Sequence, residues 1–177
     1  MPGFGKNAFS EVEDVAPPPV FGSCYRDIST TFDQTVLVTD EWVVVSALTV
    51  LPDAAAEVGL EHLGNFQFKN IGDTDKAVGM MWTGAASASA LISNLSVSFC
   101  IGIWDGAAYI PQEDDIYPFS LQGTGVQAAQ ASSKIAKVFT PKTIPPGMHS
   151  AILCRRNQAG SNLRFLAGAL SLYEVAL

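Results

Sequence analysis

The sequence predicts an all-β fold: an antiparallel β-sandwich, or jelly roll, of about eight to ten strands that follows an extended N-terminal arm. Apolar residues alternate with small or polar ones, and turn-forming clusters recur about every 8–12 residues. Residues 1–23 differ, because isolated apolar residues among Gly, Pro, Glu and Asp cannot build a core. We therefore expect an arm at 1–23 and one domain at 24–177.

The clearest strand is expected at 95–104. Large apolar side chains occupy every second position from Leu95 to Ile103 and project to one face, while Ser, Cys and Gly project to the other. This alternation is typical of an antiparallel sheet with one face on a core. Asp105-Gly106 then reverses the chain into 107–110, because both residue types tolerate a positive φ.

The other elements are expected from the same signals. Trp42–Leu51 is apolar on both faces, which indicates a central strand, and Pro52-Asp53 ends it. Residues 84–90 and 111–118 are expected to be loops, and 123–133 a small polar connection or a short helix. Further strands are expected at 35–38, 65–69, 77–83, 134–140, 148–155, 163–167 and 170–177.

Composition limits the classes of partner. Hydrophobic residues make up 48% of the 177 residues and charged residues only 15%, against about 25% in typical proteins. Low charge density favours a subunit that buries surface against neighbours, although Ser, Thr, Gln and Asn can also cover a monomer. The net charge of −7 argues against a nucleic-acid groove. Since we find neither a signal peptide nor a run of about 18 apolar residues, we expect a soluble protein with no membrane partner.

Catalytic and metal motifs are missing from the sequence. Cys24, Cys100 and Cys154 have no Cys-x-x-Cys spacing, which argues against a disulfide framework or a zinc site. His62 follows Glu61, but the His-Glu-x-x-His pattern does not occur. Neither a Gly-x-Ser-x-Gly elbow nor a phosphate-binding loop is present. We therefore expect no enzymatic activity, no cofactor and no metal.

One acidic cluster leaves an alternative open. Glu113-Asp114-Asp115 could bind a hard cation, but it lacks the spacing of an EF-hand loop, and a solvated loop is favoured. With Asp105 the same residues could also supply a carboxylate pair for glycoside hydrolysis.

Two groups of residues are candidates for binding. The arm carries dispersed aromatic residues and a polyproline segment that favours an extended path, so each ring could fill a pocket on a neighbour; a disordered tail is the alternative. The arm candidates are Phe4, Phe9, Pro17, Pro18, Pro19 and Phe21.

The second group of binding candidates is aromatic and lies near polar and acidic loop residues, as in a sugar-binding platform. Core packing or contact across an oligomer axis is the alternative. Its members are Trp104, Tyr109, Tyr117 and Phe119.

The C-terminal third resembles a known module. Residues 143–156 read Thr-Ile-Pro-Pro-Gly-Met-His-Ser-Ala-Ile-Leu-Cys-Arg-Arg, a Gly-bearing loop covers 157–162, and a final strand ends in Ala-Leu-Ser-Leu-Tyr-Glu-Val at 169–175. This pattern resembles the end of a jelly-roll structural module in tailed-phage virion proteins and is distantly similar to trimeric jelly rolls of the C1q and tumour necrosis factor type. It covers 140–177 well and the rest only in general style.

The resemblance implies a virion subunit: a non-enzymatic decoration, head-fibre or tail-associated protein, assembled in the host cytoplasm as a homotrimer. Its implied partners are further copies of itself and other virion proteins, such as the major capsid protein or a tail protein. His149 would be a structural hydrogen-bonding group, and the arm, which the module pattern does not include, would be a candidate for attachment to the particle. The alternative is a carbohydrate- or receptor-binding module of a phage fibre or tail.

Overall fold

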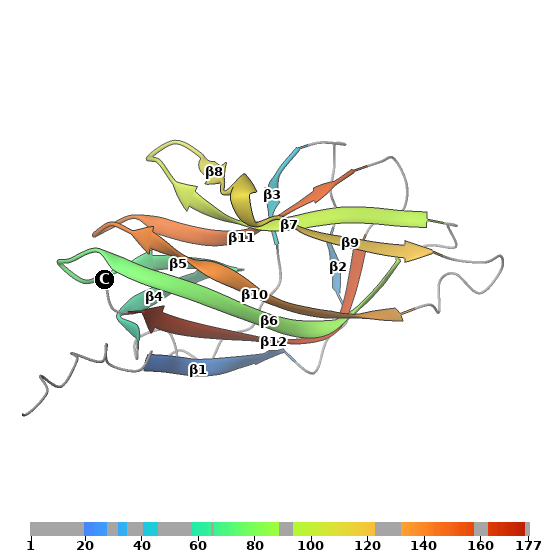
Figure 1. Cartoon of the computed structure of the whole chain (residues 1–177), viewed down its shortest axis with the longest axis horizontal. Coiled ribbons are helices and arrows are strands. Elements are labelled where there is room, and N and C mark those ends of the chain that lie inside the picture. The colour runs from blue at the N-terminus through green and yellow to red at the C-terminus, as the bar shows by residue number, and fades with distance from the viewer. Residues whose placement is uncertain are drawn as a thin grey trace, which may run out of the picture.

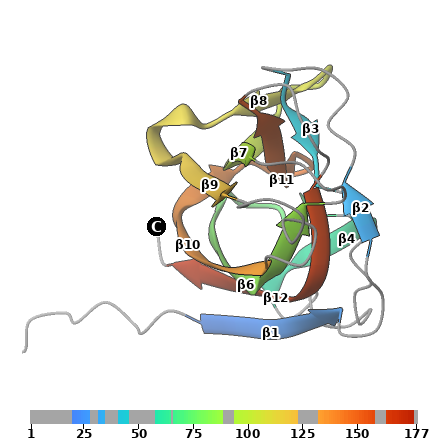
Figure 2. The ribbon, with the colours of Figure 1, turned by 90° about the vertical axis from the view of Figure 1, so that its right-hand side faces the viewer.

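The computed structural model describes residues 20–27, 32–34, 41–45, 58–64, 66–88, 94–122, 132–157 and 163–175. These residues form two antiparallel sheets that stack face to face (Figure 1, Figure 2). The described ranges contain no α-helix, and hence no helix long and apolar enough to span a bilayer. The predicted all-β sandwich is therefore confirmed.

The first sheet has five strands in the order β1-β12-β6-β10, with β2 also paired to β12. The strands are β1 Val20–Asp27, β2 Phe32–Gln34, β6 Lys76–Ala88, β10 Ser132–Ile144 and β12 Leu163–Val175. The central strand β6 is hydrogen-bonded to a 13-residue strand on each side.

The second sheet has seven strands in the order β4-β5-β11-β7-β8, with β3 paired to β11 and β9 paired to β7. The strands are β3 Val43–Val44, β4 Leu60–Gly64, β5 Gln67–Asn70, β7 Asn94–Trp104, β8 Tyr109–Pro111, β9 Tyr117–Gln122 and β11 His149–Arg156. One 3₁₀ turn, η2 Glu113–Asp115, connects β8 to β9.

The main core fills the space between the sheets. Trp82 of β6 meets Phe99 of β7 edge-on, with ring centroids 5.0 Å apart, and lies 5.4 Å from Phe66. Phe68 and Phe139 are fully buried beside them. Because each buried aromatic side chain removes about 150–250 Å² from water, this aromatic cluster dominates the apolar burial between the sheets.

A second, smaller cluster lies on the outer face of the second sheet. Cys100 of β7 and Leu153 of β11 are buried there although their neighbours in sequence face the main core. The segments around β3 and η2 cover them, with partly buried residues packed against the cluster. The sequence correctly predicts the apolar inner face of β7, but the expectation of a single face on a core is incomplete, because these covering segments also bury the outer face.

Asn70 joins two turns at one end of the sandwich. Its side-chain amide donates to the carbonyl oxygens of Thr74 (2.9 Å) and Ile144 (2.8 Å), and its carboxamide oxygen accepts the Gly72 backbone N–H (2.9 Å). Its backbone N–H and C=O bond to Met148 and Gly147 of the β10–β11 turn. Asn70 is fully buried, so these bonds satisfy polar groups that water does not reach.

Several predicted boundaries are corrected. The loop expected at 84–90 is strand β6 as far as Ala88, because the backbone pairs with β10 and β12 even where small side chains give no alternation. The two strands expected at 163–167 and 170–177 form one strand, β12, whose bulge between Phe165 and Ala167 shifts the alternation. The other strands expected after 60 are present. The loop expected at 111–118 contains η2, and the ends of β8 and β9 extend into it. Of the connection expected at 123–133, residues 132–133 belong to β10 and 123–131 lie outside the described residues.

The N-terminal part is only partly described. Strand β1 begins at Val20, within the segment predicted to be the arm, and Phe21 pairs with Tyr173 of β12. Residues 1–19, with Phe4, Phe9, Pro17, Pro18 and Pro19, lie outside the described residues. So do 35–40 and most of the strand expected at 42–51, of which β3 covers Val43–Val44.

Candidate functional site

Two of the predicted aromatic residues meet at one end of the second sheet. Trp104 ends β7 and Tyr109 begins β8, and the two residues are cross-strand partners. The turn between them is held by Asp105, whose carboxylate accepts the backbone N–H groups of Ala107 (2.8 Å) and Ala108 (2.9 Å). Bonds from Ala108 and Ala107 lower the pKa of Asp105. The predicted turn is present, and Asp105 stabilises it as an ionised hydrogen-bond acceptor.

Trp104 contacts two other rings. The Tyr109 ring lies edge-on to it at 5.2 Å, and the His149 ring of β11 stacks on it at 5.9 Å with 18° between the planes. The Tyr109 hydroxyl donates to Gln67 Oε1 at 2.9 Å, which joins β8 to β5. Trp104, Tyr109 and His149 are all partly exposed. The rings therefore form an ordered aromatic surface that solutes can reach.

Charged residues on the neighbouring strands extend the row formed by Tyr109, Trp104 and His149. Lys69 of β5 is the cross-strand partner of His149, and Glu61 of β4 is the partner of Lys69. Cross-strand partners lie on the same face of a sheet. For these residues it is the outer face, because Phe66 and Phe68, which alternate with Gln67 and Lys69, are buried in the core. We call Tyr109, Trp104, His149, Lys69 and Glu61 the end row.

The charge of His149 depends on these neighbours. Burial lowers its pKa, Lys69 lowers it further, and Glu61 acts in the opposite direction. The net effect is a pKa below the ordinary histidine value of about 6.5. His149 is therefore mainly neutral near pH 7 and gains its charge only in acid.

Tyr117 and Phe119 occupy a different environment. Both belong to β9 and pack on Phe99, with centroid distances of 6.3 and 6.4 Å. Phe119 is only 4% exposed and belongs to the main core. The four predicted aromatic residues thus form two pairs: Trp104 and Tyr109 are partly exposed in the end row, and Tyr117 and Phe119 pack on the core. For Phe119, the structure agrees with the alternative of core packing.

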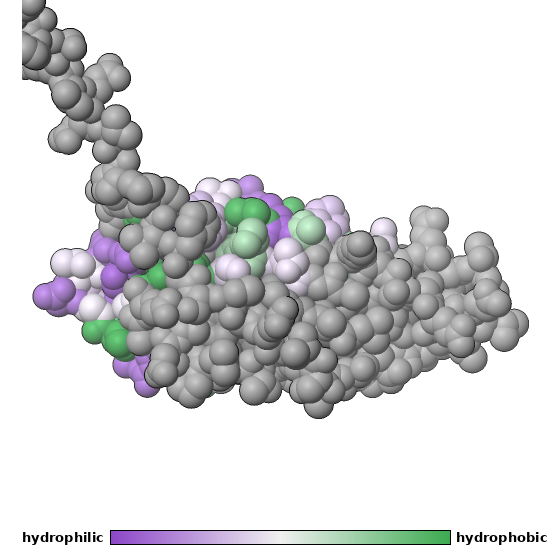
Figure 3. Space-filling model, turned by 90° about the horizontal axis from the view of Figure 1, so that it is seen from below, coloured by the Kyte–Doolittle hydropathy of each residue, from purple (hydrophilic) through white to green (hydrophobic). Residues whose placement is uncertain are grey.

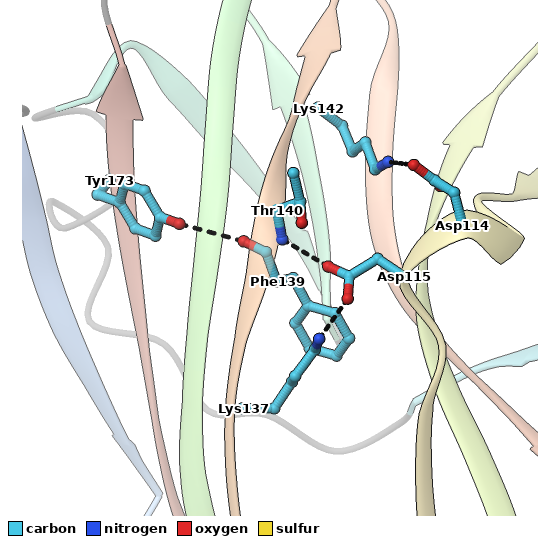
Figure 4. A network of polar contacts seen from close by, with 7 residues as sticks. All are labelled: Asp114, Asp115, Lys137, Phe139, Thr140, Lys142 and Tyr173. Atoms are coloured by element: carbon cyan, nitrogen blue, oxygen red, sulfur yellow. Dashed lines mark hydrogen bonds and ion pairs between the residues drawn. The ribbon is translucent and has the colours of Figure 1, made fainter.

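The acidic turn η2 connects the two sheets through ion pairs (Figure 4). Asp114 accepts from Lys142 of β10 at 2.6 Å, and Asp115 pairs with Lys137 of the same strand. Asp115 also accepts the backbone N–H of Thr140 at 2.5 Å. Thr140 lies where the β10 register shifts, and the Tyr173 hydroxyl donates to the neighbouring Phe139 carbonyl at 3.1 Å. Side chains thus satisfy backbone groups that the bulge removes from the ladder.

Glu113, the third acidic residue, is also paired. Its carboxylate lies 3.6 Å from Arg155 of β11 and accepts the Trp42 indole N–H at 3.3 Å. The Arg155 guanidinium lies over the Trp42 ring at 4.6 Å. Arg155 is therefore part of a cation–π and ion-pair contact.

These contacts fix the protonation states of the turn. The bond from Lys142 lowers the pKa of Asp114. Burial raises the pKa of Asp115, but the bonds from Lys137 and Thr140 outweigh it, so the net pKa is lowered. Both carboxylates are ionised at neutral pH. Glu113 and Asp114 are exposed, as expected for a solvated loop, but Asp115 is not. Two of the acidic residues also form an intersheet clamp, defined as Asp114, Asp115, Lys137 and Lys142.

No metal centre is found among the described residues, where no group of three or more His, Cys, Asp or Glu side chains is arranged to hold an ion. Cys100 and Cys154 are free and buried. Burial raises the pKa of each thiol to about 12, so both remain protonated. They lie on opposite faces of the second sheet, one in each cluster.

Sequence reasoning misses four residues of this region. It assigns His149 only a structural hydrogen bond, and it gives Gln67, Lys69 and Glu61 no role in binding, because they reach the site by strand pairing with distant segments. One signal was available: the alternation in 66–70 puts Gln67 and Lys69 on the face opposite Phe66 and Phe68.

The comparisons with known proteins support the fold. No family model matches the sequence, and no curated protein is significantly similar. The structure of Eiger TNF from S. frugiperda is similar with a TM-score of 0.51 and 10% identity, covering 90% of this chain and 94% of that chain. The match to a chain of Desmodium yellow mottle tymovirus covers 100% of this chain and 97% of that chain, with 13% identity and a TM-score of 0.32. The first likeness shows that the chain has a jelly-roll fold.

Proposed function

We propose that this chain is a non-enzymatic structural subunit of a tailed-phage virion, namely a decoration, head-fibre or tail-associated protein that assembles as a homotrimer. The jelly-roll fold and the resemblance of 143–175 to phage virion modules support this role. The non-enzymatic role is supported by one observation. The carboxylates of the acidic turn, which the sequence offered as cation ligands or catalytic acids, form structural ion pairs with Lys137, Lys142 and Arg155.

Self-association needs an accessible surface, and the first sheet provides one. Val138 of β10 is 55% exposed, and its cross-strand partner Met81 of β6 is 36% exposed. Both lie on the outer face, since Met80 and Phe139 face the core. On the side that Figure 3 shows, the coloured part of the surface mixes hydrophobic with hydrophilic residues. Subunit interfaces commonly have this mixed character.

The oligomer is tested by light scattering during size-exclusion chromatography. We expect three times the chain mass of 18.8 kDa. Val138→Lys should lower the mass if the outer face of the first sheet is the interface, and Ile110→Lys, an exposed change in β8, is the control. A wild-type monomer at high concentration would contradict the homotrimer.

Attachment to the particle is proposed for the N-terminal arm. Because β1 starts at Val20, a deletion of 1–19 removes the segment before the sheet and keeps the pairing with β12. We expect a folded oligomer that no longer co-sediments with particles. Unchanged co-sedimentation would exclude the arm as the attachment segment.

A second candidate function is recognition of a carbohydrate receptor by a fibre or tail module. It is favoured by one observation, the exposed rings of Trp104, Tyr109 and His149 at one end of the sandwich. Trp104→Ala should abolish binding to cells or glycans without changing the oligomer mass. Tyr117→Phe, on the core side of β9, is the matched control and should bind as the wild type does.

A further inference from the structure

We propose that the end row binds a saccharide that carries an anionic group, a carboxylate or a sulfate. The aromatic part would contact the apolar face of a sugar ring, and the basic part would bind the anion. This inference rests on the receptor-binding function and specifies its ligand class and the residues involved.

The aromatic part is ordered before any ligand binds. Trp104 contacts Tyr109 on one side and His149 on the other, and Tyr109 is fixed by its bond to Gln67. Asn70 holds the turn that precedes β11 and so supports the position of His149. A surface whose rotamers are already fixed loses little conformational entropy when a ligand binds.

The basic part explains why the ligand would be anionic. Lys69 is adjacent to His149 across the β5–β11 pair, on the face that carries Trp104. Lys69 lowers the pKa of His149, so the unliganded row resists a second positive charge. A bound anion would raise the pKa of His149, because it favours the protonated imidazole and accepts a charge-assisted hydrogen bond from it.

Glu61 is the acidic residue that faces this pair, from β4. Along the row, the order is Glu61, Lys69, His149 and Trp104. An anion bound over Trp104 is therefore nearer to His149 and Lys69 than to Glu61. The charged or titratable groups that act on His149 are thus Lys69 and Glu61, of opposite sign. The positive charges that would attract an anion thus lie between Glu61 and the aromatic rings of Trp104 and Tyr109.

The experiment uses the full-length protein and a glycan array with carboxylated, sulfated and neutral versions of the same saccharides. Hits are then titrated against ¹⁵N-labelled protein, following the Trp104 indole N–H. We expect anionic saccharides to bind roughly tenfold more tightly than their neutral counterparts, as one charge-assisted bond would give. The carboxylated and sulfated versions distinguish the source of the anion.

Four variants test the assignment. Lys69→Gln and His149→Gln should each remove most of the preference for the anion, and Glu61→Gln should strengthen binding. Trp104→Leu should abolish binding of both kinds of saccharide. Affinity for the anionic saccharide should rise as the pH is lowered from about 8 to about 5, and this rise should vanish in His149→Gln.

The outcomes separate the two levels of the proposal. Equal binding of anionic and neutral saccharides that depends on Trp104 would overturn the anionic class and leave carbohydrate recognition intact. No shift of the Trp104 indole with any saccharide at millimolar concentration would overturn carbohydrate recognition itself. An acidic peptide that competes at the same indole would show that the end row recognises a protein.

Discussion

The acidic turn and the end row both place charged groups beside aromatic rings on the second sheet, yet they use them in opposite ways. In the turn, Asp114 and Asp115 have cationic partners on β10, in the other sheet. In the end row, Lys69 and His149 stand side by side on a partly exposed face. The difference is that the charges of the turn are paired across the two sheets and hold them together, whereas Lys69 and its neighbour Glu61 lie on one face of one sheet and stay at least partly exposed.

The largest expected effect lies beneath the end row, at Asn70. Asn70→Leu removes the partner of the buried Ile144 carbonyl and of the part-buried Thr74 carbonyl and Gly72 N–H, and we expect a loss of about 3 kcal/mol in the free energy of unfolding. Chemical denaturation measures it. The control is Asn157→Leu, because Asn157 bonds Ser96 and Ser98 at an exposed position and should change stability by less than about 1 kcal/mol.

The clamp is expected to give the next largest effect. The Asp115 side chain is only 14% exposed, and Asp115→Ala removes the partners of both Lys137 and the Thr140 N–H. We expect a loss of about 2 kcal/mol by thermal or chemical denaturation. Asp114→Ala is the matched control, since Asp114 is 68% exposed, and its effect should be clearly smaller. Equal effects would contradict the assignment of Asp115 as the central residue of the clamp.

Acid should release the clamp. The folded state lowers the pKa of Asp114 and Asp115, so their contribution to stability is present above the ordinary Asp pKa of about 4 and is lost as the pH falls through the lowered values. Melting temperatures recorded below about pH 4 should therefore fall more steeply for the wild type than for Asp114→Asn/Asp115→Asn. His149 remains in both proteins and cancels in the comparison. Parallel curves would show that the ion pairs add nothing to stability.

The smallest effect on stability is expected in the end row. Lys69→Gln and Glu61→Gln should change the free energy of unfolding by no more than about 0.5 kcal/mol, because both side chains lie on the outer face. A larger loss would mean that the row stabilises the fold as the clamp does. Denaturation curves of the two variants beside Asp115→Ala compare the regions directly.

The sequence was sufficient for the strands with apolar alternation. The turn at Asp105-Gly106 and the strands β5 and β7 follow from local pattern, because side chains point to alternate faces of any extended chain. Strand β11 has no such alternation, since Ser150 to Cys154 are buried on both faces. The continuation of β6 through 84–88 does not follow, since small residues give no alternation and the pairing with β10 and β12 defines the strand. The bulge in β12 likewise interrupts the pattern without ending the strand.

The candidate site shows the same division between local and long-range information. Trp104 and Tyr109 could be selected from the sequence because one short turn joins them. Their contacts with His149 and Gln67, and the pairing of Asp115 with Lys137, required the tertiary structure. Alternation and turn chemistry are properties of neighbouring residues, whereas strand order and charge pairing arise when segments far apart in the chain meet on packing.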